Sequence, residues 1–316
     1  MKTKNKLLTL LILSAGTAAA TATINKFIKI SATSRNLLTD PQSLCYKWRL
    51  GNIHYTKTGS GKPLLLIHDL NAASSGYEWN QMLSRLNDRY TVYTIDLLGC
   101  GRSEKPNMTY TNYLYVQLVS DFIKSVIGHR ASVIATGESA SIPIMACANN
   151  PELFDQIMLI NPLSLHDYSQ MPGKMSKYYK LVVDFPVLGT LLYHIANSRQ
   201  AIAEELTTKY FYNPYTVKST WIDSYYESAH LGVSPKSVYA SVHCNFTKCN
   251  IVNALKKIDN SITLIGGGAI ENMSDLLNEY KAYNPSIEST MISETKYLPQ
   301  LEAPGKLMEL IDTYFG

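Results

Sequence analysis

The stretch Ala131-Ser132-Val133-Ile134-Ala135-Thr136-Gly137-Glu138-Ser139-Ala140-Ser141 joins an apolar, β-branched run to a cluster of small residues. A helix-compatible segment, residues 142–149, follows directly. This order predicts a buried strand, a very tight turn and a helix, because only small flanking residues let the backbone bend so sharply. Ser139 is predicted at the apex of the turn, with its hydroxyl exposed as a nucleophile.

Around this unit, segments with strand character and segments with helix character alternate along the chain. Alternation of this kind is typical of a mostly parallel sheet with helices on both faces. A hairpin is predicted at 46–50 and 53–57, and further strands at 63–67, 90–95, 132–136, 156–160, 261–265 and 289–292. Helices are predicted near 78–86, at 111–127, at 142–149 and from Pro304 onward.

Residues 163–258 interrupt the alternation with a helical, tyrosine-rich segment. We expect this insertion to form a cap over the carboxyl ends of the strands, where open α/β sheets bind their ligands. Two interpretations of the tyrosines remain open. They line an amphipathic pocket, or they pack the insertion and leave their hydroxyls at its surface.

The N-terminus has the pattern of a targeting segment. Three lysines precede a stretch without charge from Leu7 to Ile24, which is about long enough to cross a bilayer as a helix. Residues 1–24 are predicted as an uncleaved signal anchor or as a removed signal peptide. The folded domain then lies outside the cytoplasm, either anchored in the membrane or secreted. Residues 25–44 are predicted as a polar spacer.

Composition limits the remaining possibilities. The chain has 316 residues, of which 46% are hydrophobic and 17% charged, and this supports a large buried core. The net charge of +4 is mild and many basic residues lie near the N-terminus, so no nucleic-acid partner is expected. The five cysteines are scattered, and no cluster of histidine, cysteine and carboxylate has the spacing of metal ligands. No metal and no cofactor are expected.

From about Tyr46 to the C-terminus, the chain resembles the α/β-hydrolase fold family with a helical cap. Four stretches carry the resemblance: residues 64–69 (Leu-Leu-Leu-Ile-His-Asp), the Asp-x-x-Gly-x-Gly-x-Ser pattern at 96–103, the Gly-Glu-Ser-Ala-Ser turn at 137–141, and residues 298–304 (Leu-Pro-Gln-Leu-Glu-Ala-Pro). The resemblance implies an eight-stranded, mostly parallel sheet formed by residues 45–162 and 259–316, with the cap at 163–258.

The resemblance also implies roles for single residues. Ser139 corresponds to the nucleophile, and the backbone N–H groups of Leu70 and Ala140 correspond to the oxyanion donors. His68 and Asp69 fall in the oxyanion loop, where Asp69 replaces a glycine. A carboxylate there opposes a developing negative charge unless it points away.

The general base and the acid of the family have no clear match in this sequence. Tyr297 stands where the family has its catalytic histidine, and Glu271 is the nearest candidate for the acid. His230, in the cap, is the first choice as a substitute base. A tyrosine hydroxyl is a poor proton acceptor at neutral pH, so that Ser139 is weakly activated.

Two functions therefore remain open. One is hydrolysis of a small ester, amide or lipid-like substrate through Ser139, impaired by Tyr297. The other is a non-catalytic homologue whose pocket binds a small apolar or amphipathic ligand or a protein. Fold alone does not choose between them.

Overall fold

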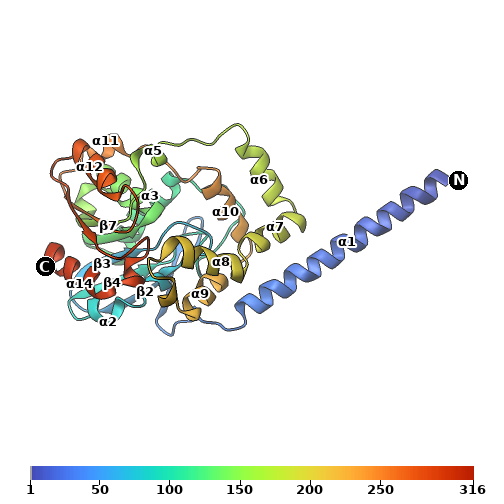
Figure 1. Ribbon diagram of the computed structural model, residues 1–316, viewed down its shortest axis with the longest axis horizontal. Helices are drawn as coiled ribbons and strands as arrows, with labels where there is room; N and C mark the ends of the chain where they lie inside the picture. The colour runs from blue at the N-terminus through green and yellow to red at the C-terminus, as the bar shows by residue number, and fades with distance from the viewer. Residues whose placement is uncertain (1) are drawn as a thin grey trace.

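The computed structural model of the protein describes residues 2–316, with side chains from Gly16 onward. Its centre is one eight-stranded sheet in the order β1-β2-β4-β3-β5-β6-β7-β8 (Figure 1). The strands are β1 (Ser43–Trp48), β2 (Gly51–Gly59), β3 (Lys62–Ile67), β4 (Tyr90–Ile95), β5 (Ala131–Thr136), β6 (Phe154–Ile160), β7 (Ser261–Gly267) and β8 (Glu288–Ile292). Strand β2 pairs antiparallel with β1 and β4, and the other neighbouring pairs are parallel. The predicted eight-stranded, mostly parallel sheet is confirmed.

Helices cover both faces of this sheet. They include α2 (Leu83–Leu86), α3 (Asn112–Phe122), α4 (Ser141–Asn149), α12 (Met273–Tyr283), α13 (Pro299–Glu302) and α14 (Pro304–Phe315). The side chains of β3 alternate between two apolar clusters, because successive residues of a strand point to opposite faces. Leu65 and Ile67 join the cluster that contains α3, α4 and α12, and Leu64 and Leu66 join the one that contains α2 and α14.

The Asp-x-x-Gly-x-Gly-x-Ser pattern forms a turn directly after β4. The carboxylate of Asp96 accepts hydrogen bonds from the backbone N–H groups of Gly76 and Arg102 and from Nε of Arg102. Burial alone raises the pKa of Asp96, but the Arg102 guanidinium, together with His54 and His68, outweighs this effect and holds the pKa well below its usual range. Ser103 donates to the carbonyl of Asp96. The motif thus fixes two loops at the carboxyl end of the sheet.

A helical region lies between β6 and β7 and corresponds to the predicted cap. It contains α5 (Leu165–Tyr168), α6 (Ser176–Asp184), α7 (Leu188–Ala196), α8 (Arg199–Glu205), α9 (Ser219–His230), α10 (Pro235–His243) and α11 (Val252–Leu255). A third apolar cluster joins Phe211 and Trp221 of this region to Ala73, Leu298 and Leu301 of the core. The cap is therefore packed onto the loops that follow β3 and β8.

The N-terminal residues form helix α1 (Lys2–Thr33). The predicted anchor or signal peptide, 1–24, falls partly outside the residues whose side chains are described. The structure differs from the predicted spacer at 25–33, which belong to α1 and contact the cap. Asn25 Nδ2 donates to the carbonyl of Val187 at 2.9 Å, and Lys29 Nζ donates to that of Gly232.

The segment after α1 is also fixed to the cap. Glu227 accepts hydrogen bonds from the backbone N–H groups of Leu37 and Leu38, and the side chain of Leu38 is buried.

In the described part of the chain, no single helix is both long and apolar enough to cross a membrane. The pair Ser176–Asp184 and Leu188–Tyr210 meets the length and composition criteria together, but it bends by 101°.

Candidate functional site

The turn after β5 is built around Gly137. Strand β5 ends at Thr136, and Gly137 adopts a left-handed backbone with φ +57°. The 3₁₀ turn Gly137–Ala140 then leads into α4. A side chain at this position would place its Cβ well inside contact distance of the Asp69 carboxyl group. The position therefore requires glycine, and the sharply bent apex of the turn is residue 137.

Ser139 lies two residues beyond this apex, which contradicts its predicted role as an exposed nucleophile. Its side chain is fully buried, and Oγ donates a hydrogen bond to the carbonyl of Thr136 at 2.7 Å. Gly137 and Glu138 are among the described residues that line the adjacent cavity, and Ser139 is not. The physical reason is the length of β5, which runs to Thr136 and puts the bend at the glycine.

The carboxylate of Asp69 occupies the space beside Gly137. Its Oδ1 accepts hydrogen bonds from the backbone N–H groups of Leu70 and Glu138, each at 2.8 Å. Two backbone donors that converge on one oxygen at a strand-to-helix turn have the geometry of an oxyanion hole. Here the protein's own carboxylate fills that hole. The assignment of Ala140 as a donor is corrected to Glu138, because the donor directly follows the apex residue.

Glu78 is buried behind Asp69. Its Oε2 accepts the backbone N–H of Asp69 at 3.2 Å, and its Oε1 accepts the hydroxyl of Tyr225 at 2.9 Å. Burial raises the pKa of Glu78 to about 8, and the nearby Asp69 carboxylate adds to the effect. Burial also raises the pKa of Asp69, although hydrogen bonds from Glu138, Leu70 and Asn71 oppose the shift. At neutral pH the protonated form of Glu78 is favoured.

Tyr297 lines the same cavity as Asp69 and Gly137. Its backbone N–H donates to the carbonyl of Tyr210 at 3.0 Å, and the two rings pack edge to face with centroids 5.7 Å apart. The side-chain amide of Asn161, just after β6, donates to the carbonyl of Tyr297. These contacts hold a phenol in the position where the resemblance leads us to expect an imidazole.

The predicted acid and substitute base lie elsewhere, which corrects both assignments. Glu271 is exposed in the turn after β7 and is not part of the cavity lining in the described chain. His230 is buried on α9, with Nδ1 2.7 Å from the carbonyl of Tyr226 and its ring stacked on that of His194 at 4.8 Å. It lines a separate, smaller cavity.

His68 has a structural position in the loop after β3. Its Nε2 accepts the backbone N–H of Leu97 at 3.0 Å, so that its proton lies on Nδ1. Nδ1 then donates to the carbonyl of Asp69 at 2.6 Å. Both ring nitrogens are used, and His68 fixes the backbone that presents Asp69.

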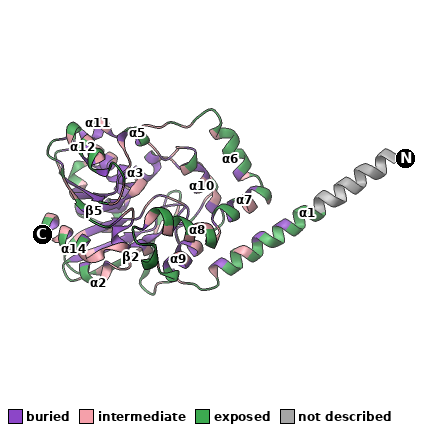
Figure 2. Ribbon diagram, viewed as in Figure 1, coloured by how far each residue is buried: buried purple, intermediate pink, exposed green. Residues whose placement is uncertain are grey.

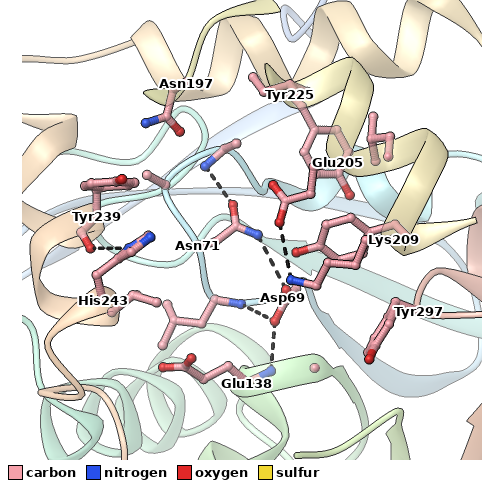
Figure 3. A pocket seen from close by; sticks show the side chains of 18 of the residues that line it. Asp69, Asn71, Glu138, Asn197, Glu205, Lys209, Tyr225, Tyr239, His243 and Tyr297 are labelled. Carbon is pink, nitrogen blue, oxygen red and sulfur yellow. Dashed lines mark hydrogen bonds and ion pairs between the residues drawn. The ribbon is translucent and has the colours of Figure 1, made fainter. Parts of the chain in front are cut away.

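A cavity of about 460 Å³ lies between the carboxyl ends of the strands and the cap (Figure 3). Tyrosines of the cap contribute to its lining, namely Tyr210, Tyr225 and Tyr239, whereas Tyr178 and Tyr215 are exposed. Some of the cap tyrosines therefore line the pocket, and others lie at the surface of the insertion, so that each of the two interpretations applies to part of the set. The aromatic rings give the cavity an apolar wall opposite the polar loop of Asp69 and Asn71.

The charged groups that line the cavity are mostly acidic. Lys209 Nζ lies 3.4 Å from Oε1 of Glu205, so these two groups form an ion pair. Asp69 and Glu138 remain as further carboxyl groups. Glu138 accepts a hydrogen bond from the hydroxyl of Thr247, and burial raises the pKa of Glu138 to about 7. The lining therefore offers a ligand more hydrogen-bond acceptors than free cations.

Residues 64–235, more than half of the chain, match the model of the alpha/beta hydrolase family. The chain belongs to this family. Over 124 residues, it is 27% identical to the soluble epoxide hydrolase of a Corynebacterium species, a match that covers 39% of this chain and 42% of that protein. The chain spans about 30% to 51% of the length of the curated relatives it matches.

Solved structures show the same α/β hydrolase fold. The epoxide hydrolase CorEH has a TM-score of 0.70 at 20% identity, over 86% of this chain and 98% of that one. A membrane phospholipase A, described as a bacterial virulence factor, has a TM-score of 0.68 at 18% identity, over 99% of this chain and 98% of that one. At these identities the likeness concerns the fold alone.

Two features of the site were not predicted from the sequence: the position of Gly137 at the apex of the turn and the contact of Glu78 with Asp69. A signal for Gly137 was present, because the β-branched run ends at Thr136 and the bend must follow the strand at once. The contact of Glu78 with Asp69 joins residues nine positions apart through a loop. No pattern in the sequence indicates that contact.

Proposed function

We propose that this member of the α/β hydrolase family binds a small molecule in its capped cavity and does not hydrolyse it through a serine. The observation that carries the proposal is the Asp69 carboxylate beside Gly137. This carboxylate occupies the space that a side chain at the apex would need. It also accepts hydrogen bonds from both backbone N–H groups of the oxyanion hole. An oxyanion intermediate needs those donors, and an anion already holds them.

The proton chemistry supports the same function. Tyr297 stands where the resemblance predicts the general base, and a phenol is a poor proton acceptor. His68 and His230 use ring nitrogens in backbone contacts, and His243, which lines the cavity, has Nδ1 3.0 Å from the carbonyl of Tyr239. The hydroxyl of Ser139 is itself bonded to the carbonyl of Thr136.

The cavity suits a small amphipathic ligand that carries hydrogen-bond donors. Its volume of about 460 Å³ lies within the range of small-molecule sites. Asp69, Glu138 and Asn71 supply acceptors, and tyrosine rings supply an apolar wall that also attracts cations. We therefore expect an ammonium compound to bind better than its neutral or anionic analogue.

A matched ligand series tests this function. Tyramine, 4-ethylphenol and 3-(4-hydroxyphenyl)propionate share one ring and differ in charge. Calorimetry with the full chain is expected to give affinities that decrease in that order. Glu138→Gln is expected to weaken tyramine several-fold, whereas Glu204→Gln, an exposed residue on α8 outside the cavity lining, is the matched control. Equal affinity for all three compounds would contradict the ligand class.

Hydrolysis through Ser139 is the second candidate, because the chain belongs to a hydrolase family and a relative is named an epoxide hydrolase. It requires Ser139 to leave Thr136 and enter the cavity. Turnover of p-nitrophenyl acetate that Ser139→Ala abolishes, and that Ser141→Ala in the same turn leaves intact, would establish it. We expect neither change to alter the rate.

We also propose that residues 1–24 anchor the chain in a membrane, with the folded domain outside the cytoplasm. The uncharged stretch from Leu7 to Ile24 and the lysines before it support this localisation. The mass of the mature protein distinguishes the anchor from a removed signal peptide, since only cleavage takes away residues of the N-terminus.

A further inference from the structure

Helices α6 and α7 expose apolar side chains along one face each. Tyr178, Leu181, Val182 and Phe185, on and just after α6, have the spacing i, i+3, i+4, i+7 and are 53% to 65% exposed. Leu188, Leu192 and Ile195 repeat the pattern on α7, at 52% to 60% exposure. Such spacing puts residues on one helix face. These side chains are called the apolar face below, and Figure 2 shows α6 as largely exposed and α7 as partly exposed.

The apolar face is distinct from the sides that hold these helices to the cap. Val183 of α6 and Tyr193 and His194 of α7 are buried. The helices bend by 101° across residues 185–187, where Val187 has φ +65°. Large contiguous apolar patches are unusual on the surface of a soluble protein and mark contact sites.

Helix α1 shows what lies beside this face. Asn25 directly follows the uncharged stretch that ends at Ile24, and its side-chain amide donates to the carbonyl of Val187, in the corner between α6 and α7. The corner is thus level with the end of the apolar part of α1. Figure 1 shows α6 and α7 on the side of the molecule from which α1 projects.

The charges around the apolar face have one dominant sign. Between Tyr168 and Ala203 the sequence contains a single acidic residue, Asp184, which pairs with Lys180. The remaining charged side chains of this segment are basic: Lys174 and Lys177, and Arg199, which pairs with Asp223 of α9. On α1, Lys26 and Lys29 follow the uncharged stretch. Basic groups that border an apolar helix face are complementary to anionic lipid headgroups.

We propose that the apolar face docks onto the surface of the same bilayer that holds α1, with its side chains at the boundary between headgroups and acyl chains. The inference rests on the proposed anchoring by residues 1–24. A bilayer is the partner that fits this face, because the end of the uncharged part of α1, the apolar face and the basic side chains lie close together on the same side of the molecule. Docking would fix the orientation of the cap relative to the membrane.

Depth-dependent fluorescence quenching tests the docking in the full chain. A Cys45→Ser background removes the exposed cysteine, and Leu181→Cys then carries an NBD fluorophore on the apolar face. Tyr215→Cys, at a 95% exposed position outside the face, carries the same label as a control. The protein is reconstituted in vesicles of phosphatidylcholine with a minority of phosphatidylglycerol, with or without doxyl-labelled lipid, and flotation is measured in parallel.

We expect doxyl lipid to reduce the emission from position 181 by about half or more and to leave that from position 215 unchanged. Protein that floats with the vesicles but shows no quenching at 181 overturns the docking and leaves the anchor intact. Protein that fails to float overturns the anchoring and, with it, the docking. A label at 181 that doxyl lipid does not quench, and whose blue shift disappears when the protein-to-lipid ratio is lowered, assigns the face to a second copy of the chain and so overturns docking to lipid.

Discussion

Replacement of Gly137 by alanine probes the contact between the apex of the turn and Asp69. The new Cβ would collide with the Asp69 carboxyl group and would stand on a left-handed backbone. The backbone effect alone costs about 1–2 kcal/mol. The collision expels the carboxylate from two charge-assisted hydrogen bonds, each worth about 1.5–3 kcal/mol. We therefore expect Gly137→Ala to lower the free energy of unfolding by about 4–8 kcal/mol.

The same substitution in an Asp69→Gly background meets no carboxylate. Only the backbone effect remains, so that Gly137→Ala should then cost about 1–2 kcal/mol. The two changes are thus coupled by about 3–6 kcal/mol, which a double-mutant cycle measures directly. Urea unfolding of the four proteins in mild detergent, followed by far-UV circular dichroism, gives the values. Additive effects, within about 0.5 kcal/mol, would refute the placement of the Asp69 carboxylate beside Gly137.

Three further predictions concern buried polar groups. Ser139→Ala should cost about 0.5–1.5 kcal/mol of stability, the worth of its bond to Thr136, with no effect on tyramine affinity; a large loss of affinity would place Ser139 in the site. Because the folded-state pKa of Glu78 is raised to about 8, its contribution to stability is complete below about pH 4.5 and is lost as the pH rises through 8. Glu78→Gln should therefore gain stability relative to the parent protein between pH 5 and pH 8 in urea titrations, and a constant difference would contradict the shift. Glu227→Ala should release residues 34–38 and speed their cleavage in limited proteolysis, while equal cleavage rates would argue against the attachment of this segment by Glu227.

The sheet was predictable because its signals are local. Strand β4 coincides with the predicted 90–95, and β5 differs from the predicted 132–136 by one residue. Short β-branched runs between turn residues leave few alternatives for the backbone. The interruption of this pattern at residues 163–258 likewise indicated a helical insertion, although it did not reveal which tyrosines face the cavity.

The site was only partly predictable, because a motif specifies residue types and not backbone conformation. The Gly-Glu-Ser-Ala-Ser pattern fits a turn with Ser139 at its apex as well as one with Gly137 there. The choice depends on where β5 ends and on the Asp69 side chain, which comes from the loop after another strand. Residues 25–33 illustrate the same limit. Their polar composition suggested a spacer, whereas contacts with distant residues such as Val187 and Gly232 attach them to the cap.

Reaction with a fluorophosphonate, followed by intact-protein mass spectrometry, tests most directly whether the site has a reactive serine. Such probes form a stable adduct only where a hydroxyl is activated next to a free oxyanion hole. With the Asp69 carboxylate on both backbone donors and Ser139 bonded to Thr136, we expect no added mass in the parent protein or in Tyr297→His. An adduct that peptide mapping assigns to Ser139 in the parent protein would contradict the proposal of a binding site without serine chemistry.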